Sequence, residues 1–293
     1  MKKTLKIAFT TLFAVLLVAC GDKNNFGNID NFDHEAQALI DNDSIRSFLE
    51  KHYYDFNVDS IKRITSNQTP LSQDANLVTM NVTESDVDYE LYVYKRREGN
   101  PTIDKGFPTV MDSVLVQYHG FSLEKTDSLV EFEYRGSPIW FQLNAVIRGW
   151  THGFTNFKNG DNNSGSNGPI TFINGGKGVL IIPSGLAYRN TGTGSGTLIN
   201  KSLIFYIDLF DFIENTDHDN DGVPSYLEDP DGDGDPRNDD TDGDGLPNFT
   251  DPDDDGDLVP TKDEDANGDG NPGNDFSDPN KPTIPDYLNP DIR

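Results

Sequence analysis

The last quarter of the chain cannot fold around an ordinary hydrophobic core, and this limits the possible architectures more than any other feature. Residues 217–293 contain 23 Asp and 2 Glu against 4 Lys or Arg, in a chain of 293 residues with a formal charge of −27. Ordering each residue costs about 1–2 kcal/mol of backbone entropy, and few apolar side chains are present here to offset it. The segment therefore either folds around cations or stays disordered as a solvating tail. Its charge excludes nucleic acid as a partner.

The acidic segment repeats one short pattern, Asp at alternate positions followed by Gly. Self-similar short units predict an array with little regular secondary structure, spanning residues 214–293. Carboxylate oxygens at this spacing are suited to Ca²⁺, which we predict as a structural ion. The predicted ligands are Asp217, Asp219, Asp221, Asp229, Asp231, Asp233, Asp240, Asp242, Asp244, Asp251, Asp253 and Asp255.

Two calcium-binding architectures share features with this array. Glu228 is the twelfth residue counted from Asp217, as in an EF-hand loop, but Pro224 interrupts the loop and a predicted strand precedes it, which excludes an EF-hand. The array instead resembles thrombospondin type 3 calcium repeats. That resemblance implies a chain wrapped around lines of Ca²⁺.

The N-terminus has the pattern of an export signal. Lysines precede an apolar run over residues 7–19 that is too short to span a bilayer. The run ends in Leu17-Val18-Ala19-Cys20, which resembles a bacterial lipobox. The resemblance implies a signal peptide over residues 1–19, a lipid anchor on Cys20, and a cell-envelope lipoprotein of the outer membrane, on its periplasmic or surface face. The alternative is an ordinary signal peptide with an unrelated cysteine. Because Cys20 is the only cysteine, no disulfide framework is possible.

Residues 20–87 are predicted to be a tether followed by a short helical segment. Residues 21–33 are rich in Asn, Asp and Gly, which is typical of a flexible linker. Apolar residues then recur at helical spacing over 36–54, which predicts one or two short helices. Residues 55–87 show no pattern that predicts an element.

Residues 88–213 carry the pattern of an α+β domain. Apolar and polar residues alternate, or apolar residues run continuously, in six segments that predict strands. One helix, over about 145–157, interrupts them, so an antiparallel sheet with one short helix is expected. The predicted strands are Tyr89–Tyr94, Ser113–Tyr118, Val130–Tyr134, Ile139–Leu143, Gly178–Ile182 and Ser202–Phe212.

Two motifs in this domain indicate one chemistry. Val146-Ile147-Arg148-Gly149-Trp150 places two aliphatic side chains and an indole on the helix, and Ile182 to Tyr188 places a tyrosine after an apolar strand. These motifs resemble the signature of FKBP-type peptidyl-prolyl cis-trans isomerases. The resemblance implies a sheet wrapped across a helix, rotation about X-Pro bonds without any cofactor, and proline-containing exported proteins as clients.

The same resemblance implies a role for each candidate site residue. Trp150 would form the floor beneath the proline ring, the Ile147 N–H and the Tyr188 hydroxyl would bind substrate carbonyls, and Asp127 would be a carboxylate at the rim. The walls would be Tyr118, Ile139, Phe141, Val146 and Phe205. Taken singly, each aromatic residue is equally typical of an ordinary core.

Four features depart from the family pattern. Thr126 precedes the predicted rim carboxylate where an aromatic residue is common, and Arg189 follows the pocket tyrosine where glycine is common. Leu198-Ile199 replaces a Pro-Pro pair, and Lys158–Pro169 is a polar insertion. These differences keep an alternative open, a non-catalytic proline-binding chaperone or surface scaffold module stiffened by calcium.

Overall fold

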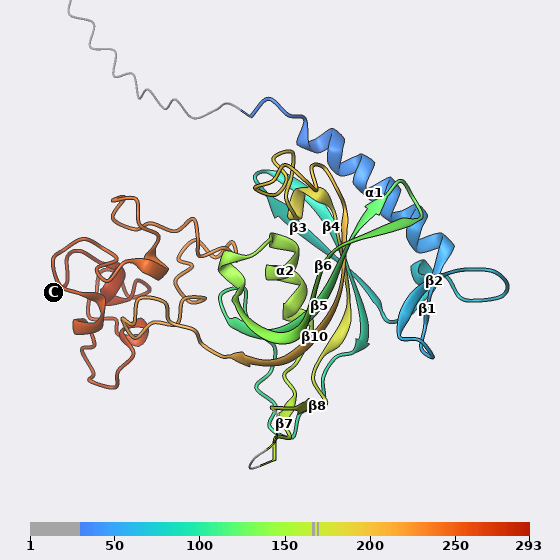
Figure 1. The fold of residues 1–293 in the computed structure, drawn as a ribbon. Helices are drawn as coiled ribbons and strands as arrows, with labels where there is room; N and C mark the ends of the chain where they lie inside the picture. The colour runs from blue at the N-terminus through green and yellow to red at the C-terminus, as the bar shows by residue number, and fades with distance from the viewer. Residues whose placement is uncertain (1–29, 166–167, 169) are drawn as a thin grey trace, which may run out of the picture. The chain divides into compact units, whose positions relative to one another are not determined.

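The computed structural model describes residues 30–165, 168 and 170–293 (Figure 1). The predicted signal peptide over residues 1–19 and the predicted lipid anchor Cys20 lie outside these residues. None of the helices within the described part of the chain has the length and apolar character needed to cross a membrane.

A six-stranded antiparallel sheet organises the fold, with strand order β3-β4-β9-β10-β5-β6. Every predicted strand is confirmed, and the two segments predicted at 130–134 and 139–143 are one long strand, β6. The sheet also contains β3, which precedes the predicted domain start at residue 88 and pairs with β4 through the turn at Ser85 and Asp86. The strands are β3 (Leu77–Glu84), β4 (Val87–Arg97), β5 (Ser113–Glu124), β6 (Ser128–Gln142), β9 (Lys177–Ile182) and β10 (Leu203–Ile213).

The helical elements are short except for the first. The 18-residue helix α1 is followed much later by α2, which has only six residues and is flanked by 3-10 turns. Residues 145–157, predicted as one helix, therefore form a brief helix between turns. The elements are α1 (His34–Lys51), η1 (Leu71–Gln73), η2 (Leu143–Ala145), α2 (Arg148–Gly153), η3 (Phe154–Asn156) and η4 (Ser184–Leu186).

α2 lies directly on the concave face of the sheet because two glycines allow it to. A Cβ added to Gly149 would lie 2.3 Å from Ile182, and one added to Gly153 would lie 2.8 Å from Leu180. Both distances are under 3.0 Å, so a side chain at either position would force Ile182 or Leu180 to shift, and glycine lets the helix approach β9 without that shift. This approach seats Trp150 within the inner hydrophobic core.

α1 covers the opposite face of the sheet, as Figure 1 shows. Asp33 caps its start by accepting a hydrogen bond from the Ala36 N–H at 2.9 Å. Ile45, Phe48 and Leu49 are buried in a second hydrophobic core with side chains of β4, β9 and β10. The sequence predicted one or two helices up to residue 54, but α1 ends at Lys51 and the chain continues into a hairpin of β1 (His52–Asp55) and β2 (Ser60–Arg63).

The polar insertion after α2 forms a small hairpin of β7 (Asp161–Asn162) and β8 (Phe172–Ile173). The acidic segment 214–293, all of which is described, contains neither α-helix nor strand. Its regular elements are four 3-10 turns, each of which begins with proline or directly follows one. They are η5 (Asn248–Thr250), η6 (Thr261–Asp263), η7 (Pro272–Asn274) and η8 (Asp286–Leu288). Residues 33–293 form one compact unit, which includes both the sheet and the acidic segment.

Candidate active site

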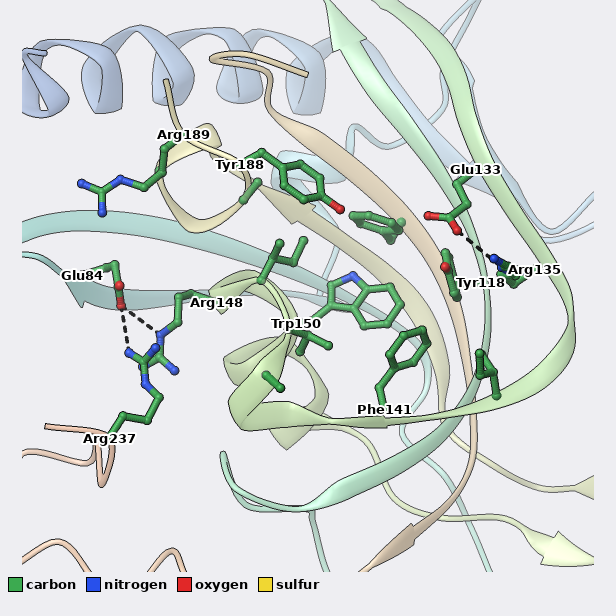
Figure 2. Close-up of a pocket in the computed structure, with 17 residues that line it drawn as sticks. Glu84, Tyr118, Glu133, Arg135, Phe141, Arg148, Trp150, Tyr188, Arg189 and Arg237 are labelled. Carbon is green, nitrogen blue, oxygen red and sulfur yellow. Dashed lines mark hydrogen bonds and ion pairs between the residues drawn. The ribbon is translucent and has the colours of Figure 1, made fainter. Parts of the chain in front are cut away.

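A cleft of about 620 Å³ opens on the inner face of the sheet, over α2 (Figure 2). Its lining combines aromatic and aliphatic side chains from β5, β6, α2 and β10 with the loop after η4. Eight of the nine residues predicted for the isomerase site line it: Tyr118, Ile139, Phe141, Val146, Ile147, Trp150, Tyr188 and Phe205.

Trp150 is fixed in the base of this cleft by other aromatic rings. It is only 4% exposed. Tyr118, Phe141 and Phe205 all meet it edge to face, at centroid distances of 4.8, 5.3 and 5.2 Å. Such contacts each stabilise the packing by about 0.5–1.5 kcal/mol beyond the buried area, so the indole has one defined orientation. Its N–H has no acceptor among the described residues.

Ile147 presents its backbone to the cleft because it is the N-cap of α2. Its backbone is extended, and its carbonyl accepts from the N–H groups of Trp150 and Thr151. No described residue accepts a hydrogen bond from the Ile147 N–H. A substrate carbonyl can therefore bind there.

Tyr188 is placed by a contact that the sequence did not predict. The loop that carries it begins at η4, and the Ser184 N–H at the start of η4 donates to the buried carboxylate of Asp41 on α1 at 2.7 Å. Burial raises the pKa of Asp41. The Tyr188 hydroxyl itself bonds to no described residue, and Figure 2 shows it pointing towards the cleft above Trp150. Burial also raises the pKa of Tyr188, which extends the pH range over which the hydroxyl is a donor.

The structure corrects the position of the rim carboxylate. Asp127 was expected at the rim, but it lies in the β5–β6 turn and pairs with Arg63 of β2 at 2.8 Å, away from the cleft lining. Glu133, farther along β6, lines the cleft instead. Burial and a hydrogen bond to Glu133 raise the pKa of Tyr118 to about 12.

The aromatic residue that the family pattern places before this carboxylate is Phe132. Its ring meets Phe205 edge to face at a centroid distance of 5.5 Å. The pair Phe132-Glu133 therefore occupies the place that the sequence assigned to Thr126-Asp127. The apparent departure at Thr126 reflects a β5–β6 hairpin that is longer than expected.

One wall of the cleft is completed by the acidic C-terminal segment. Arg148 of α2 donates to Glu84 at 2.9 Å and to Asp235 at 3.3 Å. Arg237 lines the cleft, forks onto Asp235 through two hydrogen bonds of 2.6 Å, and reaches Glu84 at 3.4 Å. Nothing in the sequence linked residues 235 and 237 to α2, because contacts over such separations leave no local pattern.

The predicted metal ligands gather into clusters, with changes in membership. Three clusters have the predicted members, which are Asp217/Asp219/Asp221, Asp229/Asp231/Asp233 and Asp240/Asp242/Asp244. The fourth contains Asp253, Asp255 and Asp257, whereas Asp251 belongs to none of the clusters. Within each cluster one carboxylate oxygen per residue lies within 4.8 Å of the others.

A fifth cluster joins residues that are distant in sequence. Asp221, Glu228 and Asp254 are all buried and their oxygens lie within 4.8 Å of one another. Glu228 is 0% exposed, and neither of its oxygens has a partner among the described residues. Burial and the neighbouring carboxylates raise the pKa of Glu228 to about 10 and that of Asp254 to about 8. Glu228, the twelfth residue counted from Asp217, therefore lies beside Asp221 of the same loop, although no helices flank this loop as they do in an EF-hand.

Known proteins resemble this chain in two separate regions. An FK506-binding protein of Streptomyces anulatus is 34% identical over 100 residues, which are 33% of this chain and 68% of that protein. The chain belongs to the FKBP family. The family model described as BamM C-terminal (BamM_C) matches residues 218–291, so the acidic segment outside the FKBP domain resembles that family.

Two further FKBP relatives are named as FkpA isomerases. The probable FKBP-type peptidyl-prolyl cis-trans isomerase FkpA of Neisseria meningitidis is 30% identical over 163 residues, covering 55% of this chain and 49% of that protein. FkpA of Escherichia coli is 34% identical over 104 residues, covering 36% and 32%. The chain therefore spans about half the length of the first of these relatives and about a third of the second.

Solved structures of the same kind resemble the chain more loosely. A peptidyl-prolyl cis-trans isomerase of Pseudomonas syringae aligns with a TM-score of 0.39 at 18% identity, over 63% of this chain and 98% of that chain. FkpA of Escherichia coli aligns with a TM-score of 0.34 at 28% identity, over 49% and 54%. The FKBP assignment accordingly rests on the sequences.

Proposed function

We propose that this FKBP protein is a peptidyl-prolyl cis-trans isomerase that assists the folding of exported proteins. The observation that carries the proposal is a tryptophan floor flanked by two hydrogen-bond donors, the Ile147 N–H and the Tyr188 hydroxyl, neither of which has a partner among the described residues. The relatives named as FKBP-type isomerases support it. The export signal and lipobox-like sequence ending at Cys20 support a lipid-anchored position at the cell envelope.

The chemistry needs no nucleophile. Rotation about a peptide bond is slow because the planar form has partial double-bond character, with a barrier of about 18–20 kcal/mol. The twisted transition state loses this resonance and becomes less polar. An apolar cleft built on Trp150 binds the twisted form better than the planar form, and such differential binding lowers the barrier.

The two donors orient the substrate in this cleft. The proline ring would rest on Trp150, with the adjacent carbonyl groups accepting from Ile147 and Tyr188. Because the aromatic rings already hold Trp150 in place, the site is organised before substrate arrives and little ordering is needed on binding.

We further propose that the acidic segment binds Ca²⁺ as a structural ion. The residues fit such an ion, because buried carboxylate oxygens without partners surround Glu228 and hard oxygen ligands are what Ca²⁺ requires. Bound Ca²⁺ would neutralise the repulsion between these carboxylates. The ion would stiffen a segment that contributes Arg237 to the cleft wall.

An isomerisation assay separates this proposal from a module that binds proline without turning it over. The chain without its first 20 residues is mixed with an X-Pro peptide, and cis-trans exchange is followed by NMR exchange spectroscopy, with and without Ca²⁺. An exchange rate above the uncatalysed value supports the isomerase. Peptide binding at the uncatalysed rate would favour the proline-binding module instead.

A further inference from the structure

The rim of the cleft is richer in positive charge than the rest of this acidic chain. Four arginines and two glutamates line the cleft, in a chain with a formal charge of −27. In the view of Figure 2, Arg148, Arg189 and Arg237 lie on one side of Trp150, and Arg135 lies on the other with Glu133. The side with three arginines is the side next to the Tyr188 loop.

Three of the four arginines are engaged with carboxylates of the protein. Arg135 pairs with Glu133 at 3.4 Å, and Arg148 and Arg237 share Glu84 and Asp235. Arg189 differs from these three. The hydrogen bond that its guanidinium makes within the described chain goes to a hydroxyl, Ser85 Oγ at 3.1 Å, and no carboxylate of the described residues pairs with it.

The backbone of Arg189 gives a second reason to single it out. Its φ is +52°, in the left-handed region that favours glycine. A side chain in this region costs about 1–2 kcal/mol relative to glycine. The loop nevertheless carries arginine here, directly after Tyr188, with its N–H bonded to the Ser184 carbonyl at 2.9 Å. Backbone strain at a residue that lines a cleft is consistent with a role for its side chain there.

We propose that Arg189 binds an acidic side chain adjacent to the substrate proline, so that this protein prefers clients with Glu or Asp next to proline. This inference rests on the proposed proline-binding function of the cleft. Arg189 lines the same cleft as Tyr188, so a peptide whose carbonyl accepts from the Tyr188 hydroxyl lies in a cleft that Arg189 also borders. Ser85 leaves most of the five guanidinium N–H donors available to a carboxylate. Glu84 and Asp235 neutralise much of the charge of Arg148 and Arg237, so selectivity at this side falls mainly to Arg189.

The test compares matched peptides that differ only in one side chain. Binding of Ala-Glu-Pro-Phe and Ala-Gln-Pro-Phe, and of the corresponding Pro-Glu and Pro-Gln peptides, is measured by NMR titration of the chain without its first 20 residues. A partly exposed charge-assisted contact should give a preference of about 3- to 10-fold for Glu over Gln in at least one pair at low salt. That preference should shrink as salt rises, because the contact is screened.

Two variants with the same change of charge show whether Arg189 causes the preference for Glu peptides. Arg189→Gln should abolish the preference for Glu and leave affinity for the Gln peptides nearly unchanged. Lys62→Gln, at an exposed position on β2, should keep the preference. Arg189→Lys, which keeps the charge, should restore part of it.

The outcomes separate this inference from the proposed function. Equal affinities for the Glu and Gln peptides of both pairs, or a preference that survives Arg189→Gln, would overturn the acidic subsite and leave the isomerase proposal intact. Because the readout is binding, the subsite is tested even if exchange proves uncatalysed.

Discussion

Removing the Tyr188 hydroxyl should slow isomerisation without weakening the fold. Tyr188→Phe keeps the ring, and the lost hydroxyl bonds to no described residue, so no buried group is left without a partner. The free energy of unfolding should change by no more than about 0.5 kcal/mol. A neutral hydrogen bond contributes about 0.5–1.5 kcal/mol, so kcat/KM should fall by about 2- to 12-fold.

A second tyrosine supplies the matched control. The Tyr206 hydroxyl accepts from the Ile61 N–H at 3.0 Å on the face of the sheet opposite the cleft. Tyr206→Phe leaves that N–H unpaired, which should lower the free energy of unfolding by about 1–3 kcal/mol while kcat/KM stays unchanged. Tyr188→Phe should thus lower kcat/KM without lowering stability, and Tyr206→Phe should lower stability without lowering kcat/KM.

Urea unfolding and NMR exchange spectroscopy measure both quantities on the same samples. Burial raises the pKa of Tyr188, so its neutral, donating form persists to higher pH than an ordinary tyrosine, and the wild-type rate should not decline before about pH 10. If Tyr188→Phe is folded and has the kcat/KM of the wild type, the hydroxyl does not bind the transition state and the assignment of this donor fails.

Further substitutions and ligand removal test the other assignments. Asp127→Ala should leave kcat/KM within about 2-fold of wild type and Glu133→Ala should reduce it more, since only the Glu133 carboxylate lines the cleft. A larger loss in Asp127→Ala than in Glu133→Ala would show that Asp127 is the rim carboxylate, as the sequence predicts. Asp41→Ala should lower the free energy of unfolding by about 1–3 kcal/mol and slow exchange, because it leaves a buried N–H of the Tyr188 loop unpaired. If the variant has the unfolding free energy and the exchange rate of the wild type, Asp41 does not position the loop. Chelation of Ca²⁺ should make residues 214–293 sensitive to protease, with Mg²⁺ a poor substitute, and an unchanged cleavage pattern would indicate a tail that does not depend on calcium. Cys20→Ser should release the protein from membranes on fractionation, and wild-type partitioning would exclude the anchor.

Local patterns were sufficient to predict five of the six strands of the sheet and most of the cleft, whereas β3 was not predicted. Alternation of apolar residues located β4, β5 and β6, and continuous apolar runs located β9 and β10, whose two faces belong to the two hydrophobic cores. The motif around Trp150 located the floor because its glycines and aromatic residues are consecutive in sequence.

The errors came from features that local patterns do not determine. The length of the β5–β6 hairpin decides which acidic residue reaches the cleft, and both Asp127 and Glu133 lie in that hairpin. Asp41 left a weak signal, since it lies on the same helix face as the buried Ile45 and Phe48. Asp235 and Arg237 left none, because their partners are more than 80 residues away.

The strand order has a consequence for how the chain folds as it is synthesised. β3–β4 and β5–β6 are hairpins between neighbours in sequence, and each can form as soon as it is made. In the sheet, however, β9 and β10 lie between them. The inner edges of the two hairpins, β4 and β5, therefore stay unpaired until residues 177–213 are made and pair with them as β9 and β10. Closure of the sheet depends on these late, long-range pairings, which are slow to form. A protein proposed to speed the folding of other chains would thus itself complete its sheet in a late step.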